Sequence, residues 1–210
     1  PPHGVPSLRS AIAEYHGKHG VDWEAGEVTV TAGSGVSLFA STAGTVNPGE
    51  GVVLLEPYFL SYSNLVEYVG AREVGVPLGE DQGYRLDVEA LKENVSGKTK
   101  MIVLCNPNNP TSNQFPRAEV MKVVDGFQGF VLIDEAYAEY GEYSLILEAL
   151  DRENLLILRT FSKAYGLAGL RLGYGVMNGV LARILAERYQ MPFSVPNFVL
   201  RVGARLLDER

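Results

Sequence analysis

The chain has 210 residues, of which 46% are hydrophobic, and a formal net charge of −7. This size allows one sizeable hydrophobic core, either as one domain or as one domain with a fragment of another. The acidic balance argues against a nucleic-acid-binding protein, because no basic stripe is present to neutralise phosphates. No apolar run is long enough to span a membrane, and the single cysteine, Cys105, suits a reducing compartment. We therefore expect a cytoplasmic protein that binds neither nucleic acid nor membrane.

Short apolar runs alternate with segments of helical periodicity along the chain. In chain order, the patterns predict a helix marked by Leu8, Ile12 and Tyr15, a strand at Val28–Thr31, a helix at Val36–Val46, a strand at Val52–Leu55, helices at Tyr58–Val69 and Asp87–Asn94, a strand at Met101–Cys105, a helix at Pro116–Val124, strands at Phe130–Asp134 and Leu155–Thr160, and helices at Gly179–Tyr189 and Pro196–Asp208. Pro116 suits a first helical turn, and Asn178 is the expected cap of the helix that follows it. This alternation predicts a doubly wound α/β sheet.

One further strand is expected to run against the others. The segment Arg171–Met177 has strand character, but only about ten Gly-rich residues separate it from the strand that ends at Thr160. A parallel crossover needs roughly a dozen residues or more. The sequence therefore predicts a mostly parallel, doubly wound sheet with one antiparallel strand and with helices on both faces.

Ligands of open α/β sheets bind at the carboxyl ends of the strands, and the first unusual segment at such an end is Thr31–Gly35, TAGSG. Its glycines let backbone N–H groups approach an anion at a helix N-terminus. An ordinary strand-to-helix turn is an equally good interpretation. A dinucleotide site is a further alternative, with Glu56 as the ribose-binding acid, although Leu38 stands where the third glycine of that motif belongs.

Two more strand ends carry polar groups. After Cys105 the chain reads NPNNPT, a rigid turn that can present an amide side chain. Asp134 closes the apolar strand that begins at Phe130. A buried carboxylate must meet a cation, a metal or hydrogen-bond donors, because burial without a partner is costly. We therefore expect Asp134 to face a ligand or a cationic partner.

The fourth segment places a lysine directly after a buried strand. Lys163 lies in TFSKAYG, between hydroxyl-bearing residues, and Arg171 follows eight residues later. Most lysines are solvated surface charges, but a lysine on a Gly-rich loop beside buried strands can act as a nucleophile toward carbonyls. Lys163 is therefore the candidate catalytic residue.

Together the segments call for a ligand that combines an anion, a ring in need of a charge partner, and a carbonyl group. Pyridoxal 5'-phosphate has all three, and no metal is expected. The expected partners are Ser34, Gly35, Thr160 and Arg171 for the phosphate, Asp134 for the pyridine nitrogen, and Lys163 for the aldehyde.

The motifs also resemble those of a known family. NPNNPT (Asn106–Thr111), DEAY (Asp134–Tyr137) and TFSKAYGLAGLRLGY (Thr160–Tyr174) are similar in order and spacing to those of fold-type I, class I/II, pyridoxal-phosphate-dependent aminotransferases. Within this family, the motif sequences are most similar to those of histidinol-phosphate aminotransferases, and threonine-phosphate decarboxylases share much of the pattern. The resemblance implies transfer of an amino group from an amino acid or amino-alcohol phosphate to a keto acceptor.

The resemblance also implies roles for single residues. Lys163 would form the internal aldimine and move the proton at Cα, and Asp134 would keep the pyridine nitrogen protonated. Asn109 and Tyr137 would bond the phenolic oxygen of the ring, and Phe59 would stack on its face, unless it is an ordinary core phenylalanine. The positions that correspond to the phosphate site are Ser34, Gly35, Thr160, Ser162 and Arg171.

Residues 1–210 are expected to be the pyridoxal-phosphate-binding large domain alone. In the family, a C-terminal small domain supplies an arginine for the substrate carboxylate, and an N-terminal tyrosine reaches the neighbouring subunit of a homodimer; this chain is expected to lack both segments. Ser112 stands where the family has a glycine. A same-family decarboxylase, an NAD(P)-dependent oxidoreductase and a cofactor-binding fragment without turnover remain alternatives. His3, His16 and His19 match no motif and are expected at the surface.

Overall fold

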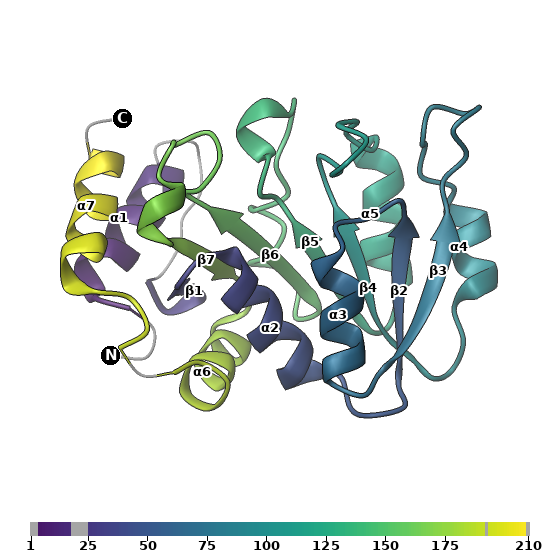
Figure 1. The fold of residues 1–210 in the computed structure, drawn as a ribbon, viewed down its shortest axis with the longest axis horizontal. Coiled ribbons are helices and arrows are strands. Elements are labelled where there is room, and N and C mark those ends of the chain that lie inside the picture. The colour runs from purple at the N-terminus through teal and green to yellow at the C-terminus, as the bar shows by residue number, and fades with distance from the viewer. Residues whose placement is uncertain (1–3, 18–24, 192, 209–210) are drawn as a thin grey trace.

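The computed structural model describes residues 4–17, 25–191 and 193–208. A seven-stranded sheet runs through it, with helices on both faces (Figure 1). The strands are β1 (Val28–Thr31), β2 (Gly51–Glu56), β3 (Arg72–Pro77), β4 (Thr99–Cys105), β5 (Phe130–Asp134), β6 (Leu155–Thr160) and β7 (Gly173–Val176). The helices are α1 (Pro6–Gly17), α2 (Ser34–Thr45), α3 (Ser61–Tyr68), α4 (Val88–Asn94), α5 (Arg117–Gly126), α6 (Gly179–Arg188) and α7 (Asn197–Asp208), with short 3-10 helices η1 (Ala25–Glu27), η2 (Ala138–Tyr140) and η3 (Ala168–Leu170).

The strand order is β1-β7-β6-β5-β4-β2-β3. Strand β7 pairs antiparallel with both β1 and β6, and the pairs from β6 through β3 are parallel. The predicted fold class is therefore confirmed, including the antiparallel strand after β6. Strand β3 was not predicted. It lies at the sheet edge and is buried only at Val76, so it lacks the continuous apolar run that marks a strand covered on both faces.

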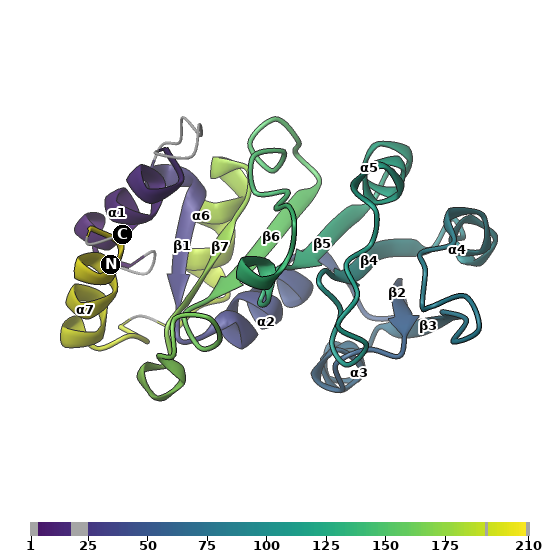
Figure 2. The same ribbon diagram turned by 90° about the horizontal axis from the view of Figure 1, so that it is seen from above.

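Side chains of each strand alternate between two hydrophobic cores. One core lies under α1, α4, α5 and α7 and includes Val131 and Ile133 of β5. The other lies under α2, α3 and α6 and includes Leu132. Figure 2 shows the two layers of helices from the edge of the sheet. Since Asp134 follows Leu132 by two residues, the carboxylate belongs on the α2 and α3 face.

The helix ends follow the expected capping chemistry with small shifts of the bounds. Asp87 caps α4, where its side chain accepts hydrogen bonds from Glu89 N and Ala90 N, both at 3.0 Å. Asn178 caps α6 through Val180 N at 3.0 Å, as predicted. Pro116 occupies the cap position of α5 and not its first turn, because its extended backbone lies just outside the helix.

His16 is not a surface residue, and that prediction was wrong. Its side chain is 5% exposed, and its Nε2 lies 3.0 Å from the hydroxyl of Tyr174. His16 follows Leu8 and Ile12 at intervals of four, so all three lie on the face of α1 that packs on the sheet. Sequence motifs could not reveal this, because the partner is 158 positions away. His3 and His19 lie outside the described residues.

A buried ion-pair network lies on the face of the sheet that carries α1. Arg159 of β6 is 5% exposed. Its Nη1 lies 2.8 Å from Glu135 Oε2 and its Nη2 lies 2.6 Å from Glu139 Oε1. Glu135 also accepts a hydrogen bond from Leu145 N at 2.6 Å. The network thereby fastens the segment after β5 to the sheet.

Replacing Arg159 with leucine should lower the free energy of unfolding by about 3–5 kcal/mol, because the Glu135 carboxylate would stay buried without its cationic partner. Arg152→Leu is the matched control. Arg152 forms an ion pair with the more exposed Asp125, and such pairs contribute about 0–1 kcal/mol. Urea unfolding of both variants measures the difference, and equal losses would contradict this role of the network.

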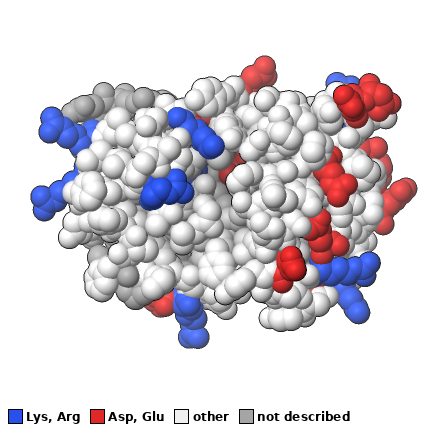
Figure 3. All heavy atoms as spheres, viewed as in Figure 1, with Lys and Arg blue, Asp and Glu red and all other residues white. Residues whose placement is uncertain are grey.

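Charge is unevenly distributed over the face seen in Figure 3. Asp and Glu side chains lie mainly over the half that carries β2, β3 and α3 in Figure 1, and Lys and Arg mainly over the half that carries α1 and α7. An anionic ligand is therefore repelled least over the half that carries α1 and α7. No helix in the described ranges is long and apolar enough to cross a membrane.

Candidate active site

A cavity of about 440 Å³ opens at the carboxyl ends of β4, β5 and β6, beside α2 and α3. Every predicted site residue lines it: Ser34, Gly35, Phe59, Asn109, Asp134, Tyr137, Thr160, Ser162, Lys163 and Arg171. The last residues of the three strands, Cys105, Asp134 and Thr160, all contribute to its lining. The fold therefore gathers side chains that are far apart in the sequence, as the strand-end rule predicts.

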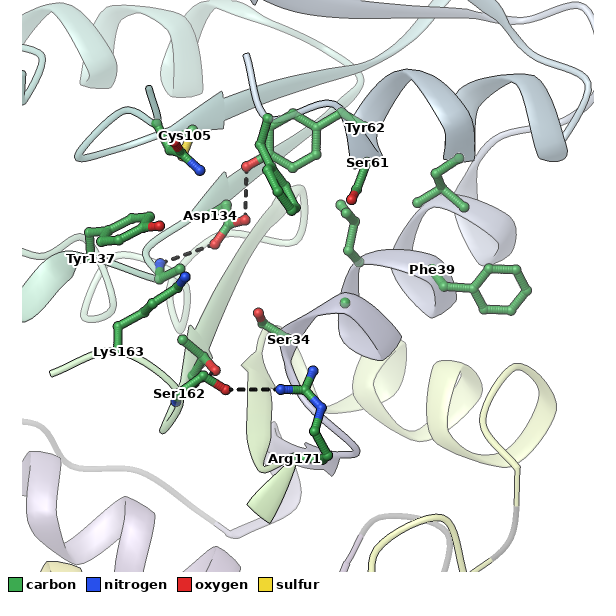
Figure 4. A pocket seen from close by; sticks show the side chains of 17 residues that line it. Ser34, Phe39, Ser61, Tyr62, Cys105, Asp134, Tyr137, Ser162, Lys163 and Arg171 are labelled. Atoms are coloured by element: carbon green, nitrogen blue, oxygen red, sulfur yellow. Dashed lines mark hydrogen bonds between the residues drawn. The ribbon is translucent and has the colours of Figure 1, made fainter. Parts of the chain in front are cut away.

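One end of the cavity brings an arginine side chain to the N-terminus of a helix. Ser34 opens α2, whose first N–H groups point outward, and Arg171 lies beside it (Figure 4). Nη1 of Arg171 donates to Ser162 Oγ at 3.4 Å. Gly33 has φ 84°, and a Cβ there would lie 2.8 Å from Arg171 Nη2. A Cβ on Gly173 would collide with Ser34 N. Glycine at position 33 therefore leaves room for the guanidinium, and glycine at position 173 lets β7 approach the start of α2.

Asp134 is the buried carboxylate of the cavity. Its Oδ1 accepts from Ala136 N at 3.0 Å, and its Oδ2 accepts from the hydroxyl of Tyr62 at 2.8 Å. Burial raises the pKa of Asp134, because the charged form loses hydration, while the two hydrogen bonds and the charge of Lys163 oppose the rise. The site therefore holds an acid whose charge depends on its partners.

The neighbouring carboxylate points away from the cavity. Glu135 accepts from Arg159 and from the Ser144 hydroxyl, at 2.8 and 2.6 Å, on the other side of the sheet. Asp134 and Glu135 therefore face opposite sides of the sheet. This arrangement follows from the alternation of side chains along a strand.

Lys163 extends into the cavity from the loop after β6. In Figure 4 its amine points toward Asp134 and Tyr137, and Nζ lies 5.1 Å from the centre of the Tyr137 ring. Phe161 anchors the loop, because its side chain is fully buried and its N–H donates to Leu172 O at 3.0 Å. A fixed loop base and an amine inside the cavity suit a lysine that reacts with a ligand.

The turn at Asn106–Thr111 presents one asparagine side chain to the cavity. Its other two asparagine side chains make hydrogen bonds that stabilise the turn. Asn106 Oδ1 accepts from Phe115 N at 2.8 Å. Asn108 Nδ2 donates to Pro57 O at 3.1 Å, which ties the turn to the segment after β2. Asn109 is the asparagine that lines the cavity. The density of asparagine and proline in this turn thus has a structural explanation for two of its three amides.

Phe59 lies at the rim of the cavity. It is 44% exposed, so the alternative interpretation as an ordinary core phenylalanine is wrong. Its ring is nearly perpendicular to that of Tyr62, at 85° with 5.8 Å between the centroids. Its ring therefore remains free to contact a ligand.

Several lining residues were not predicted. They are Leu38, Phe39, Ser61, Tyr62, Leu65, Cys105 and Ala136. Tyr62 could have been found from its spacing of three from Phe59, which puts both on one side of a helical turn. Burial raises the pKa of the Cys105 thiol to about 12, so Cys105 is a neutral wall residue.

The structure does not support the alternative hypothesis of a dinucleotide site with Glu56 as its ribose-binding acid. Glu56 ends β2, and its carboxylate lies against Gly75 of β3, where a Cβ would collide with it. It does not belong to the described lining of the cavity. Among the described residues, no group of three or more His, Cys, Asp or Glu side chains is placed to hold a metal.

Fold and site define a protein of the α/β class with a lysine, a buried acid, an arginine and a helix N-terminus around one cavity. Over residues 1–210 the chain matches the model of the family described as aminotransferase class I and II. The chain belongs to this family.

Relatives and solved structures agree with this assignment. The chain is 44% identical to a histidinol-phosphate aminotransferase of Methanococcus maripaludis over 133 residues, which are 62% of this chain and 36% of the relative. It is 40% identical to that of Symbiobacterium thermophilum over 169 residues, 78% of this chain and 45% of the relative. The match thus spans less than half of these relatives.

The fold is also that of solved aminotransferases. An aspartate aminotransferase of Thermus thermophilus aligns with a TM-score of 0.88 at 27% identity, covering 99% of this chain and 58% of that one. N-succinyldiaminopimelate aminotransferase of Mycobacterium tuberculosis aligns with a TM-score of 0.89 at 29% identity, covering 99% and 57%.

Proposed function

We propose that this chain is the pyridoxal-phosphate-binding core of an aminotransferase that acts on an amino acid or an amino-alcohol phosphate, as histidinol-phosphate aminotransferases do. The observation that carries the proposal is the meeting of Lys163, Asp134 and Arg171 in one cavity. An amine, a buried carboxylate and a guanidinium beside a helix N-terminus match the aldehyde, the pyridine nitrogen and the phosphate of this cofactor.

The donor set of the cavity fits the cofactor part by part. The phosphate would lie at the start of α2 with Arg171, and the carboxylate of Asp134 would accept a hydrogen bond from the protonated pyridine nitrogen. When bound, the cofactor supplies an electron-accepting ring that stabilises negative charge at the substrate Cα. The hydroxyl and backbone groups proposed to complete the phosphate site belong to Ser34, Gly35, Thr160 and Ser162.

The remaining groups orient the ring and move the proton. Lys163 would hold the cofactor covalently through its amine. Once the substrate amine has displaced it, the freed Nζ would remain in the cavity and would take the Cα proton. Asn109 and Tyr137 would donate hydrogen bonds to the phenolic oxygen. Phe59, at the rim, would stack on one face of the ring.

The relatives favour transamination over the alternatives. Those named above are aminotransferases, which supports amino-group transfer and gives the decarboxylase alternative no support. The position of Glu56 speaks against an NAD(P)-dependent oxidoreductase. We further infer that residues 1–210 act as the large, cofactor-binding domain of a homodimeric enzyme with small-molecule amino donors and keto acceptors.

A cofactor titration tests the proposal. Adding pyridoxal phosphate to the purified chain should produce a saturable yellow absorbance band, and NAD(P)H should produce no binding signal. Lys122→Ala serves as a control, because Lys122 is exposed on α5 and pairs with Glu119 at 2.9 Å. The variant should behave like the parent chain. Binding of nicotinamide cofactor without any yellow band would contradict the proposal.

Turnover by these 210 residues should nevertheless be very slow. Lys163 and Arg171 are the cations among the described residues of the cavity lining, and both are assigned to the cofactor. A further cation must fix the substrate carboxylate so that the Cα–H bond stands perpendicular to the ring, and loss of such positioning costs orders of magnitude in rate. Single-turnover absorbance with candidate amino acids measures conversion to the pyridoxamine form. Rates of an ordinary aminotransferase would place the carboxylate-binding group within this chain.

A further inference from the structure

Tyr62 makes a contact with Asp134 that the proposed function does not yet use. Its hydroxyl lies 2.8 Å from Oδ2, and Tyr62 is 72 residues away in the sequence, on the first turn of α3. The other described donor to this carboxylate is the N–H of Ala136, only two residues along the chain. Tyr62 is therefore the contact that ties the acid to a separate element of the fold.

The phenol acts as the donor in this contact. Burial raises the pKa of Tyr62, and the neighbouring Asp134 carboxylate raises it further. The hydroxyl consequently stays protonated, and its proton is available to Oδ2. A hydrogen bond of this kind favours the charged form of a carboxyl group.

Asp134 needs such a donor more than an exposed acid does. Its surroundings disfavour the carboxylate chiefly through loss of hydration, and a neutral acid would bind a protonated pyridine nitrogen weakly. Each carboxylate oxygen accepts one donor, Oδ1 from Ala136 and Oδ2 from Tyr62. Without the phenol, one of these oxygens would be buried without a protein donor among the described contacts.

The same turn also places the aromatic ring of Phe59 at the rim of the cavity. Tyr62 N donates to Phe59 O at 2.9 Å, so Phe59 and Tyr62 are held one turn apart. The first side chain reaches the rim and the second reaches the buried acid. The segment after β2 thus supplies both a face for the ligand and a support for its charge partner.

The geometry points to Tyr62 as a positioning residue that keeps Asp134 ionised and directed at the pyridine nitrogen of the cofactor. The inference rests on the proposed function for its ligand, but the contact between the two side chains can be tested without cofactor. The competing explanation is that Tyr62 is only a core side chain, since its ring packs in the core under α2 and α3.

Tyr62→Phe separates the two explanations, because it keeps the ring and removes the hydroxyl. Tyr58→Phe is the matched control. Tyr58 also donates its phenol to a carboxylate, that of Glu73, its ring centroid lies 6.4 Å from that of Tyr62, and it is not among the described residues of the cavity lining. Both variants retain an aromatic ring, and thermal unfolding checks that both fold.

The first measurement follows the side-chain carboxyl carbon of Asp134 by NMR in the cofactor-free chain. In Tyr62→Phe its titration should move to higher pH than in the parent chain, and in Tyr58→Phe it should not move. An unchanged titration in Tyr62→Phe would overturn the inference, whatever the chain binds.

The second measurement is the dissociation constant of pyridoxal phosphate against pH. Near neutral pH, Tyr62→Phe should bind about tenfold more weakly, as expected for a lost hydrogen bond to a charged group. The ratio to the parent chain should shrink as the pH rises, because Asp134 then ionises without help. A ratio that does not depend on pH would mean a packing role and would overturn the inference. A parent chain that binds no cofactor would instead refute the proposed function, and the NMR titration would still decide the role of Tyr62 toward Asp134.

Discussion

Replacing Lys163 with alanine should abolish covalent capture of pyridoxal phosphate by this chain. The cofactor should still bind through its phosphate and ring, because Arg171, Asp134 and the α2 end remain in the cavity. The yellow band should be lost, since it requires an amine bonded to the aldehyde carbon. Any residual amino transfer should fall further by at least about 10²–10⁴-fold, the usual contribution of a positioned acid–base group.

The matched control is Lys98→Ala, which removes a lysine from the turn before β4, outside the described cavity lining. Absorbance titration of both variants checks the prediction. If Lys163→Ala kept the band and Lys98→Ala lost it, the nucleophile would have been assigned to the wrong loop.

Asp134→Ala and Glu135→Ala should damage the protein in opposite ways. Removing Asp134 deletes the charge partner of the pyridine nitrogen, and breaking a buried ion pair costs about 3–5 kcal/mol. Cofactor affinity should therefore fall by about two to four orders of magnitude. At neutral pH and without cofactor, Asp134→Ala should have a free energy of unfolding no lower than that of the parent chain. Burial raises the pKa of Asp134, so its ionisation above the unfolded pKa opposes folding.

Glu135→Ala should instead lower stability and spare cofactor binding. It leaves Arg159 buried and without the ion pair of 2.8 Å, on the face of the sheet opposite the cavity. Urea unfolding and cofactor titration of both variants give a two-by-two comparison. Equal losses of cofactor affinity in the two variants would contradict the assignment of Asp134, and not Glu135, as the residue that contacts the cofactor.

Central strands and strand-end chemistry could be predicted because both are local properties of the sequence. β5 and β6 each begin with a continuous apolar run, and their bounds match the prediction residue for residue. Asp134 stands out because it closes such a run, and Lys163 because it lies among hydroxyl-bearing residues on the loop that follows β6. Edge strand β3 could not be predicted in the same way, because its side chains are mostly half-buried or exposed.

Contacts between distant segments were beyond the sequence patterns. Tyr62 resembles any aromatic residue on the apolar side of a helix, and its role depends on a hydrogen bond to a residue 72 positions away. His16 resembles a surface histidine until α1 is packed on the sheet next to Tyr174. In both cases a polar group is satisfied by tertiary packing, which leaves no local signal.

Borohydride reduction of the cofactor-treated chain, followed by peptide mass spectrometry, tests the central claim most directly. Reduction fixes the bond between cofactor and amine, so the modified residue can be read from the peptide masses. The pyridoxyl mass should be found on the peptide that contains Lys163, and it should be absent from that peptide in Lys163→Ala. A pyridoxyl mass on Lys98 or Lys122, with Lys163 unmodified, would contradict the proposed site.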